Sequence, residues 1–381
     1  MGNGGSGAVK ILIVSHYFPP HVGGIEYVAQ NQAKYLAKAG NDITVLTSAI
    51  GAPKGSEVKD GYTIQRIVAS NLIENKSGVP FPIFSPKLFT KAYSLVKNTD
   101  IVHIHDAFYI SSFTATFWAW VLRKPVVLNQ HVAMVPHPSK SVNFIQKVVY
   151  GTSGKFIFHK SARIIILNSD VKDFLINKGV KENKMVFIPN GVDTALYHPA
   201  TATERKEIRK KYNLPPDTPL VLFVGRFVPK KGFDILLKSG GKNYKILFVG
   251  GDKPNDQVDD NSYIFLGSKS PKETAEIYRA CNIFALPSKG EGFPLSIQEA
   301  MSSGLPIITS KAKGYNLYEF NDNLFSMVKP TPENITTRIT KILSDKKLRN
   351  DMGEYSLSYA LKYFDWNVEV RQIQELYGAT V

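Results

Sequence analysis

Short aliphatic runs alternate with amphipathic segments along most of this chain. Residues 9–15 and 220–224 are nearly continuous apolar runs, which is typical of strands buried on both faces of a parallel sheet. Each run leads into a glycine-containing loop, a segment of helical periodicity and another apolar run. This order predicts two successive α/β halves, each built from strand–loop–helix–strand units.

The expected elements follow from this periodicity along the chain. Strands are predicted at 9–15, 43–47, 100–105, 125–129, 163–167, 184–188, 220–224, 245–249, 264–266, 283–286, 306–309 and 324–328. Helices are predicted at 25–39, 113–122, 143–160, 200–212, 274–280, 332–343 and 346–363, with others starting at Phe233 and Pro294 and a last one ending near Tyr377.

The length of 381 residues exceeds one ordinary hydrophobic core and predicts two domains. We place a flexible glycine-rich tail at 1–8, a first domain at 9–198, a second at 199–363 and a terminal helix at 364–381. The tail matches the Met-Gly-x-x-x-Ser lipidation pattern. We interpret it as a disordered leader or a cloning remnant and leave it out of the fold.

Composition limits the class of protein. At 43% hydrophobic and 21% charged residues the chain is an ordinary globular one. A single cysteine, Cys281, excludes an internal disulfide and fits a reducing compartment. No apolar run approaches the roughly 18–20 residues of a membrane span. The formal charge of +15 predicts an acidic partner, which leaves nucleic acid, an anionic membrane face and phosphorylated ligands.

Polar residues recur directly after the predicted strands of the first half, and in a parallel sheet they would gather at one edge. These residues are His16, His105, His131, Ser169 and Asn190. We select His131 as the catalytic candidate because it follows the end of a strand.

The other histidines of this region have plainer interpretations. His103 lies within a strand and is expected in the core or behind the site. His105, His137 and His159 are expected to be solvated or structural. No Gly-x-Gly-x-x-Gly fingerprint is present, which disfavours a dinucleotide oxidoreductase.

Three loops supply candidate anion ligands. Gly23 and Gly24 precede a helix and could offer bare N–H groups, or simply make a tight turn. Arg226 and Lys231 can bracket an anion from one loop, whereas Lys230 is expected to be solvated.

The third loop begins the stretch 288–304, which carries two carboxylates. Glu291 lies between glycines, Pro294 is expected at the first helical position, and Glu299 follows inside the helix that Gly304 ends. The loop thus opens at the carboxyl end of a strand and the amino end of a helix, where α/β proteins bind phosphate-bearing ligands.

Taken in order, the motifs resemble those of the retaining family 4 glycosyltransferases, whose GT-B fold has two Rossmann-like domains facing each other across a cleft. The resemblance covers nearly the whole chain from Val9. It is carried by Pro19-Pro-His-Val-Gly-Gly-Ile-Glu26, Asp100-Ile-Val-His-Ile-His105, Ile188-Pro-Asn-Gly-Val-Asp193, Gly225-Arg226…Lys231-Gly232, Leu286-Pro-Ser-Lys-Gly-Glu291…Glu299-Ala-Met and Phe364-Asp-Trp366.

The resemblance implies a role for each matching position. Glu299 would bind the ribose hydroxyls of a nucleotide, Glu291 the hydroxyls of the donor sugar, and His131 would lie beside the sugar ring. The diphosphate would be held by Arg226 and Lys231. Further donor contacts are implied for Gly23, Gly24, Gly292, Phe293, Pro294 and Leu295.

The chain departs from the family pattern in two places. Only residues 233–244 separate the Lys231 loop from the next strand, which is shorter than usual. Residues 311–319 replace a Gly-Gly-x-x-Glu-like segment, so no role is assigned to Glu319. No Asp-x-Asp motif is present, so we expect Arg226 and Lys231 to replace a metal ion on the diphosphate, with no cofactor.

The expected activity is transfer of a hexose from a UDP- or GDP-sugar to a glycan or lipid-linked acceptor, by front-face attack with retention. The enzyme is expected to be cytoplasmic, with a peripheral site on the inner membrane face as one use of its positive charge. Basic and aromatic residues at 81–97 and 144–160 could form that surface, or could be ordinary solvated helices. A non-catalytic nucleotide or glycan binder on the same fold is the alternative. A nucleic-acid binder is disfavoured because the lysines are dispersed.

Overall fold

The computed structural model describes residues 8–254, 261–289 and 292–380, which form two compact units. Unit 1 comprises residues 1–190 together with 369–381, and unit 2 comprises residues 191–368. Each unit is an α/β domain with its own sheet, which confirms the predicted fold class.

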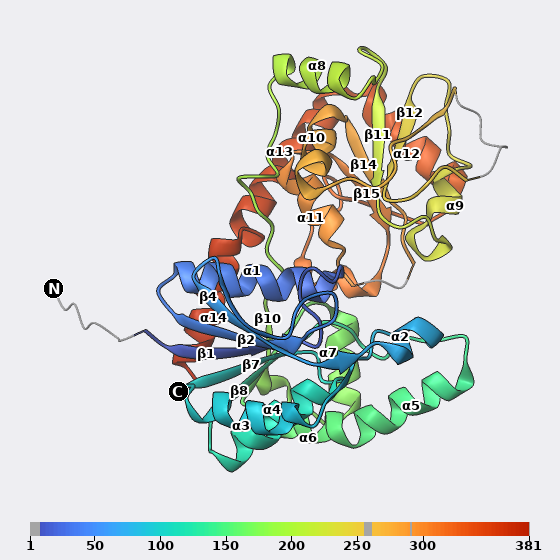
Figure 1. Cartoon of the computed structure of the whole chain (residues 1–381). Helices are drawn as coiled ribbons and strands as arrows, with labels where there is room; N and C mark the ends of the chain where they lie inside the picture. The colour runs from blue at the N-terminus through green and yellow to red at the C-terminus, as the bar shows by residue number, and fades with distance from the viewer. Residues whose placement is uncertain (1–7, 255–260, 290–291, 381) are drawn as a thin grey trace. The chain divides into compact units, whose positions relative to one another are not determined.

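Unit 1 is built on an eight-stranded sheet (Figure 1). In spatial order the strands are β10 (Met185–Phe187), β9 (Arg163–Ile166), β8 (Val126–Gln130), β7 (Ile101–His105), β1 (Lys10–Val14), β2 (Asp42–Ser48), β4 (Tyr62–Ile67) and β3 (Gly55–Lys59). All neighbouring strands are parallel except β3 and β4. The inner strands are buried on both faces, which is why they are continuous aliphatic runs.

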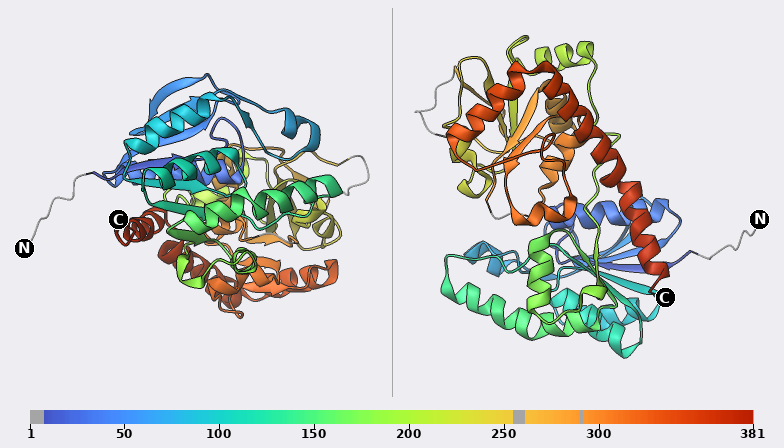
Figure 2. Two further views of the ribbon diagram at one scale, coloured as in Figure 1. Left: turned by 90° about the horizontal axis from the view of Figure 1, so that it is seen from below. Right: turned by 180° about the vertical axis from the view of Figure 1, so that it is seen from behind.

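Helices cover both faces of this sheet. The helices of unit 1 are α1 (Gly24–Lys38), α2 (Leu72–Ser77), α3 (Lys87–Lys97), α4 (Ile110–Val121), α5 (Lys140–Gly151), α6 (Ser153–Lys160) and α7 (Ser169–Asn177). Figure 2 shows α1 on one face and the group α3, α4, α5 and α6 on the other. The short strands β5 (Ala69–Ser70) and β6 (Ile83–Phe84) pair in a small antiparallel sheet, and α2 lies between them in the sequence.

Unit 2 repeats the design with a fully parallel six-stranded sheet. Its spatial order is β13 (Tyr263–Phe265), β12 (Lys245–Val249), β11 (Leu220–Val224), β14 (Ile283–Leu286), β15 (Ile307–Ser310) and β16 (Ser326–Val328). Its helices are α8 (Ala202–Lys211), α9 (Phe233–Leu236), α10 (Pro271–Ala280), α11 (Leu295–Ser302), α12 (Pro332–Ser344) and α13 (Lys346–Tyr363).

The last helix, α14 (Trp366–Gly378), returns the chain to unit 1. Its Ile373 and Tyr377 belong to the same buried cluster as Ile13 of β1 and Ala29 of α1. The buried side chain of Gln32 donates a hydrogen bond to Glu369, with 2.8 Å between nitrogen and oxygen. The end of the chain is therefore part of the first core.

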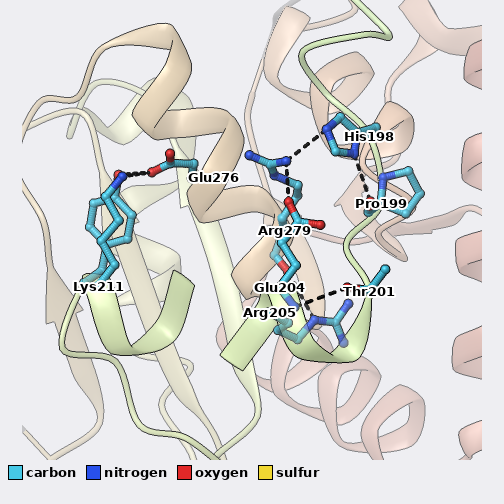
Figure 3. A network of polar contacts seen from close by, with 9 residues as sticks. His198, Pro199, Thr201, Glu204, Arg205, Lys211, Glu276 and Arg279 are labelled. Carbon is cyan, nitrogen blue, oxygen red and sulfur yellow. Dashed lines mark hydrogen bonds and ion pairs between the residues drawn. The ribbon is translucent and has the colours of Figure 1, made fainter. Parts of the chain in front are cut away.

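The division between the units falls at 190/191 and 368/369, where sequence alone placed it at 198/199 and 363/364. The reason is that the connecting segment packs on unit 2. The backbone N–H of Val192 donates to the carbonyl of Phe364. In Figure 3, Arg279 of α10 bonds both His198 (2.9 Å) and Glu204 (2.7 Å).

The ends of α8 are held on α10 in the same way. Lys211 lies 2.6 Å from Glu276, and the guanidinium of Arg205 donates to the carbonyl of Arg279 (Figure 3). Thr201 caps the start of α8 by accepting a hydrogen bond from the backbone of Glu204. These bonds make α8 and the segment before it part of unit 2.

Two local predictions were wrong, and one hairpin was not predicted. The helix expected at 143–160 is two helices, because Thr152 has φ −116° and ψ −91°, outside the helical range. Pro294 is the N-cap of α11, with ψ 135°, and Leu295 is the first helical residue. The β3–β4 hairpin was missed because β3 is exposed along its whole length and has no apolar alternation.

Among the described residues, no helix is long and apolar enough to cross a membrane. The apolar run at 113–122 instead forms most of α4, whose Ala115 and Ala119 are fully buried.

Candidate active site

Each sheet has a point where the chain reverses its direction of winding. In unit 2 the chain passes from β11 outward to β12 and β13, then returns to the other side of β11 with β14. Ligands of open parallel sheets bind beyond the carboxyl ends of the strands at such a point. The loops that leave β11 and β14 therefore define the candidate site of unit 2.

These two loops are joined to each other. The backbone N–H of Lys289 donates to the carbonyl of Lys230 at 2.8 Å. Gly232 has φ +74°, and a Cβ there would lie 2.2 Å from the carbonyl oxygen of Pro287. Glycine is required at this position by both the backbone conformation and the close approach. The contact fixes the basic loop against the loop that carries the glycine-rich motif.

Arg226 and Lys231 both lie in this basic loop. Arg226 follows β11 and is exposed, while Lys231 ends a short 3₁₀ turn, Pro229–Lys231, and is half-buried. The Lys231 side chain passes close to Gly225, since a Cβ on that glycine would lie 3.7 Å from Lys231 Cδ. The prediction that Lys230 is solvated is confirmed, because its side chain is exposed.

Glu299 lies on α11, which follows β14, and two tyrosines hold its carboxylate. The hydroxyl of Tyr278 on α10 donates to Oε2 at 2.9 Å, and Tyr197 forms a second hydrogen bond. Burial raises the pKa of Glu299, and the two hydroxyl groups oppose that rise. Sequence analysis missed both tyrosines, because they lie outside the motif and only folding brings them to it.

The structure describes the glycine-rich motif from Gly292 onward. Glu291 lies outside the described residues. Gly292, Pro294 and Leu295 lead into α11, so their backbone is at the amino end of that helix. The Phe293 side chain is buried, with its ring centroid 4.3 Å from that of Tyr318. Phe293 can therefore serve a ligand only through its backbone.

Unit 1 has its own winding reversal between β1 and β7. His16 lies just beyond β1 and stacks on Tyr109, with 3.4 Å between ring centroids and 7° between the planes. His105 ends β7, and His131 comes directly after β8. The three histidines lie at the carboxyl ends of neighbouring strands, as the sequence predicted.

His131 and His105 form a hydrogen-bonded pair. Their Nε2 and Nδ1 atoms are 2.9 Å apart, and both side chains are buried. Burial lowers the pKa of His131 to about 3 and that of His105 well below its usual value. His105 was expected to be solvated or structural; it is buried on the central strand β7, which excludes the solvated alternative and leaves the structural one. His103 is buried, as predicted.

The predicted anion site at Gly23 and Gly24 contains a carboxylate of the protein itself. A Cβ on Gly23 would lie 2.2 Å from Glu26 Oε2, so that carboxylate covers the amino end of α1. His21 holds it through Nδ1, 2.7 Å from Glu26 Oε1. A Cβ on Gly24 would meet nothing within 4 Å, so the second glycine is open.

A polar cluster that the sequence did not indicate continues from this carboxylate. The hydroxyl of Tyr17 donates to Glu74 at 2.8 Å and also contacts Asn71. Glu74 lies 3.5 Å from His21 Nε2, and the His21 ring stacks on Tyr17. These contacts join α2 to the loop after β1, and no sequence motif marks α2.

Asp106 directly follows His105 at the end of β7 and is fully buried. Its Oδ1 accepts hydrogen bonds from Gln130 Nε2 at 2.9 Å and from the backbone of Phe108 at 3.3 Å. Burial raises the pKa of Asp106 to about 6, and these hydrogen bonds oppose the rise. Asp106 directly follows the Asp-Ile-Val-His-Ile-His motif, so its position was readable, but its burial was not.

Both halves of the chain match family models of glycosyltransferases. The model of the family described as Glycosyltransferase Family 4 matches residues 22–196, and that described as Glycosyl transferases group 1 matches residues 204–358. A D-inositol 3-phosphate glycosyltransferase from Corynebacterium aurimucosum is 23% identical, with 97% of this chain and 96% of the relative aligned. Sulfoquinovosyl transferase of Arabidopsis thaliana is 24% identical over 95% of this chain and 72% of its own.

Solved structures share the fold. The Anabaena protein HepE in complex with UDP has a TM-score of 0.76 at 17% identity, covering 97% of this chain and 100% of its own. A sucrose-phosphate synthase from Thermosynechococcus elongatus has a TM-score of 0.74 at 21% identity, covering 97% and 98%. With the two halves matched by these two family models and each half folded around its own α/β sheet, the chain belongs to the family 4 glycosyltransferases of the GT-B fold.

Proposed function

We propose that this glycosyltransferase transfers a hexose from a UDP- or GDP-sugar to a glycan or lipid-linked acceptor, with retention of configuration. The relatives support a nucleotide-sugar donor, since HepE was solved with UDP and with UDP-glucose. A lipid-linked acceptor is supported by a 29% identical relative from Campylobacter jejuni, aligned over 63% of this chain. It is named as an N-acetylgalactosaminyltransferase acting on N,N'-diacetylbacillosaminyl-diphospho-undecaprenol.

The observation that carries the proposal is the pair of joined loops in unit 2. They hold two cations, Arg226 and Lys231, at the carboxyl edge of the sheet, and Glu299 follows on the next helix. Cations fixed by a folded loop stabilise the negative charge that develops on a departing diphosphate. A carboxylate held by two tyrosines is suited to accept hydrogen bonds from the two hydroxyls of a ribose.

The proposed mechanism needs no metal ion or cofactor. Arg226 and Lys231 neutralise the diphosphate, and the N–H groups at the start of α11 add partial positive charge. The acceptor hydroxyl attacks the anomeric carbon from the face that the diphosphate leaves, and the leaving phosphate oxygen takes its proton. Glu291 is proposed to bind the sugar hydroxyls, and no residue is assigned as a nucleophile.

In unit 1 we propose that His131 contacts the sugar. Its neutral ring at physiological pH suits a hydrogen bond to a hydroxyl group rather than a charge contact. Gly24 is proposed to donate a backbone N–H to the donor phosphates. The carboxylate of Glu26 lies against the neighbouring Gly23 and so borders this position.

A membrane-facing surface is also proposed, on α5. This helix turns Gln146 inward, where it bonds the backbone of Val135 at 2.9 Å, and turns apolar residues outward. Phe144, Ile145 and Val148 are 67%, 55% and 45% exposed. The exposed lysines of α5 are Lys140 and Lys147, and the following helix α6 adds Lys155 and Lys160. Apolar side chains among lysines suit the face of an anionic bilayer.

Calorimetry with UDP and GDP tests donor binding. Glu299→Ala should weaken the affinity for the preferred nucleoside diphosphate about 10- to 150-fold, because charge-assisted hydrogen bonds contribute about 1.5–3 kcal/mol. Glu333→Ala, on the exposed first turn of α12, is the control and should bind normally. Unchanged affinity in Glu299→Ala, or no binding of either nucleotide by the wild type, would contradict the proposal.

A further inference from the structure

His105 at the end of β7 and His131 just after β8 form a pair in which His105 has no assigned role. The rings of His105 and His131 are nearly parallel, with 16° between planes and 5.2 Å between centroids. Their Nδ1 and Nε2 atoms are joined at 2.9 Å. We propose that His105 is a positioning residue that holds His131 in one tautomer. In this tautomer the hydrogen of His131 is on Nδ1, and His131 Nε2 accepts a hydrogen bond from His105.

The first step is the charge of the pair. Both side chains are buried, and burial disfavours the charged imidazolium form of each. A neutral imidazole carries one hydrogen, so one of its nitrogens is a donor and the other an acceptor. The bond between the two rings therefore admits only two arrangements: His105 donates to His131, or His131 donates to His105.

The second step chooses between them. His105 Nε2 is buried and has no hydrogen-bond partner in the structure. If His131 donated, His105 would have to carry its own hydrogen on Nε2, as a buried donor without an acceptor. Orphaned buried N–H groups are rarer than orphaned acceptors. We therefore assign the hydrogen of His105 to Nδ1, where it donates to His131 Nε2, which leaves the hydrogen of His131 on Nδ1.

The third step is the support behind the pair. The ring of His103 stacks on that of His105, with 5.1 Å between centroids and 5° between planes. His103 Nδ1 lies 2.5 Å from the hydroxyl of Tyr377 on α14. Because His103 and His105 lie on the central strand β7 and are fully buried, the orientation of the His105 ring is set by the core. The fixed His105 ring in turn holds the His131 ring in one orientation through the hydrogen bond between them.

The consequence for chemistry rests on the proposed function. With its hydrogen on Nδ1, His131 offers a neutral donor from that nitrogen, suited to a sugar hydroxyl oxygen. His131 Nε2 already accepts a hydrogen bond, so it is not available to take a proton from an acceptor. His131 therefore orients the sugar, and the proton transfer is left to the leaving phosphate.

Imidazole nitrogen spectra of histidine-labelled protein test the assignment directly. A long-range proton–nitrogen correlation spectrum at pH 7 should show His131 with its hydrogen on Nδ1. The resonances are assigned by their loss in His131→Gln, which leaves seven of the eight histidines. A hydrogen on His131 Nε2 in the wild-type protein would overturn the proposal.

Two substitutions of His105 separate positioning from packing. His105→Asn keeps an N–H near the former Nδ1 and should keep both the tautomer and the kcat of the wild type. His105→Leu removes the donor; it should give a mixture of tautomers and lower kcat about fivefold, the effect of one hydrogen bond, with an unchanged KM for the donor sugar. Equal behaviour of the two variants, in spectrum and in kcat, would contradict the assignment.

The spectrum also separates this inference from the proposed function. A protein that shows the Nδ1 tautomer but transfers no sugar from any nucleotide sugar would refute the function and leave the positioning intact. If His105→Leu does not fold, the wild-type and His105→Asn spectra still decide the tautomer.

Discussion

At the scale of residues, the chemistry depends on where ionisable groups are buried. Asp106 lies at the end of β7, fully buried among groups that include Gln130 and Tyr150. The histidines beside it are buried as neutral rings, so their pKa values are lowered while that of Asp106 is raised. The pKa values of the acid and of the histidines shift in opposite directions for one reason, because burial penalises the charged form of each group.

Replacing Asp106 by Asn should change how stability depends on pH. Burial raises the folded pKa of Asp106 from 3.8 to about 6, so the folded state binds the proton more tightly than the unfolded state. The stability from the protonated form is present below pH 3.8 and is lost as the pH rises through 6. Between pH 4 and pH 7, Asp106→Asn should therefore gain about 2 kcal/mol relative to wild type, which is most of the total difference of about 3 kcal/mol between the two pKa values.

Chemical denaturation at several pH values measures this difference. The buried histidines contribute equally to both proteins and cancel in the comparison. Asp170→Asn, at the exposed first turn of α7, is the control and should show no such trend. A constant difference between Asp106→Asn and wild type across this range would mean that Asp106 is not held in its acid form.

At the scale of elements, the site depends on loops meeting across the end of a sheet. Gly232 allows the loop after β11 to contact Pro287 after β14. Gly250 also lies close to Gly225, because a Cβ on Gly250 would be 2.5 Å from the Gly225 carbonyl oxygen. The three loops thus pack backbone against backbone. Such packing leaves the cations little freedom, which favours a site that is formed before the ligand binds.

Gly232→Ala should therefore weaken nucleoside diphosphate binding about tenfold, as expected for one lost charge-assisted hydrogen bond. Its added Cβ would clash with Pro287 and displace the loop that carries Lys231. Gly267→Ala is the matched control, since Gly267 has φ +69° but open space around its Cβ position. The control should lose only about 1–2 kcal/mol of stability, the cost of the left-handed backbone. Equal binding by the two variants would show that the loop contact does not shape the site.

The surface of α5 gives a second prediction at this scale. Changing Phe144 and Ile145 together to Ser should reduce binding to vesicles containing anionic lipid by tenfold or more, since each buried apolar side chain contributes about 1.5–3 kcal/mol. Val58→Ser, on the exposed strand β3, is the control and should bind normally. Cosedimentation measures both. Equal vesicle binding by the double variant and the wild type would remove α5 from the proposed membrane surface.

At the scale of the whole molecule, the chain closes on its first domain through its last helix. Ile373 is fully buried in the core that β1 and α1 share with α14. The hydrogen bond between Gln32 and Glu369 joins residues that are 337 positions apart. Because the first unit is incomplete without residues 369–381, its stability must depend on the far end of the sequence.

Ile373→Ala should destabilise unit 1 by about 2–5 kcal/mol, the usual cost of truncating a large buried aliphatic residue. Hydrogen exchange measured by mass spectrometry should show faster exchange in α1, β1 and β2. Leu361→Ala on α13 is the control, because that side chain is 49% exposed. Unchanged exchange in β1 would contradict the placement of α14 in the first core.

Much of this architecture was determined by the sequence itself. The aliphatic runs identified the buried strands, since a strand covered on both faces has no polar side to interrupt the run. The glycine-rich loops and the residues that follow each strand identified Arg226, Lys231, Glu299 and His131 as site candidates. Exposed elements such as β3 were missed, because their residues are not selected by burial.

Other features were decided only by the tertiary structure. Strand order placed the winding reversals beside β11 and β14 and beside β1 and β7, and so decided which of many strand ends form a site. Burial gave His105 its role, and the fold brought Tyr278 to Glu299 and Glu26 onto Gly23. These contacts join positions that no local pattern relates, because pKa values and hydrogen-bond partners depend on what packs around a side chain in three dimensions.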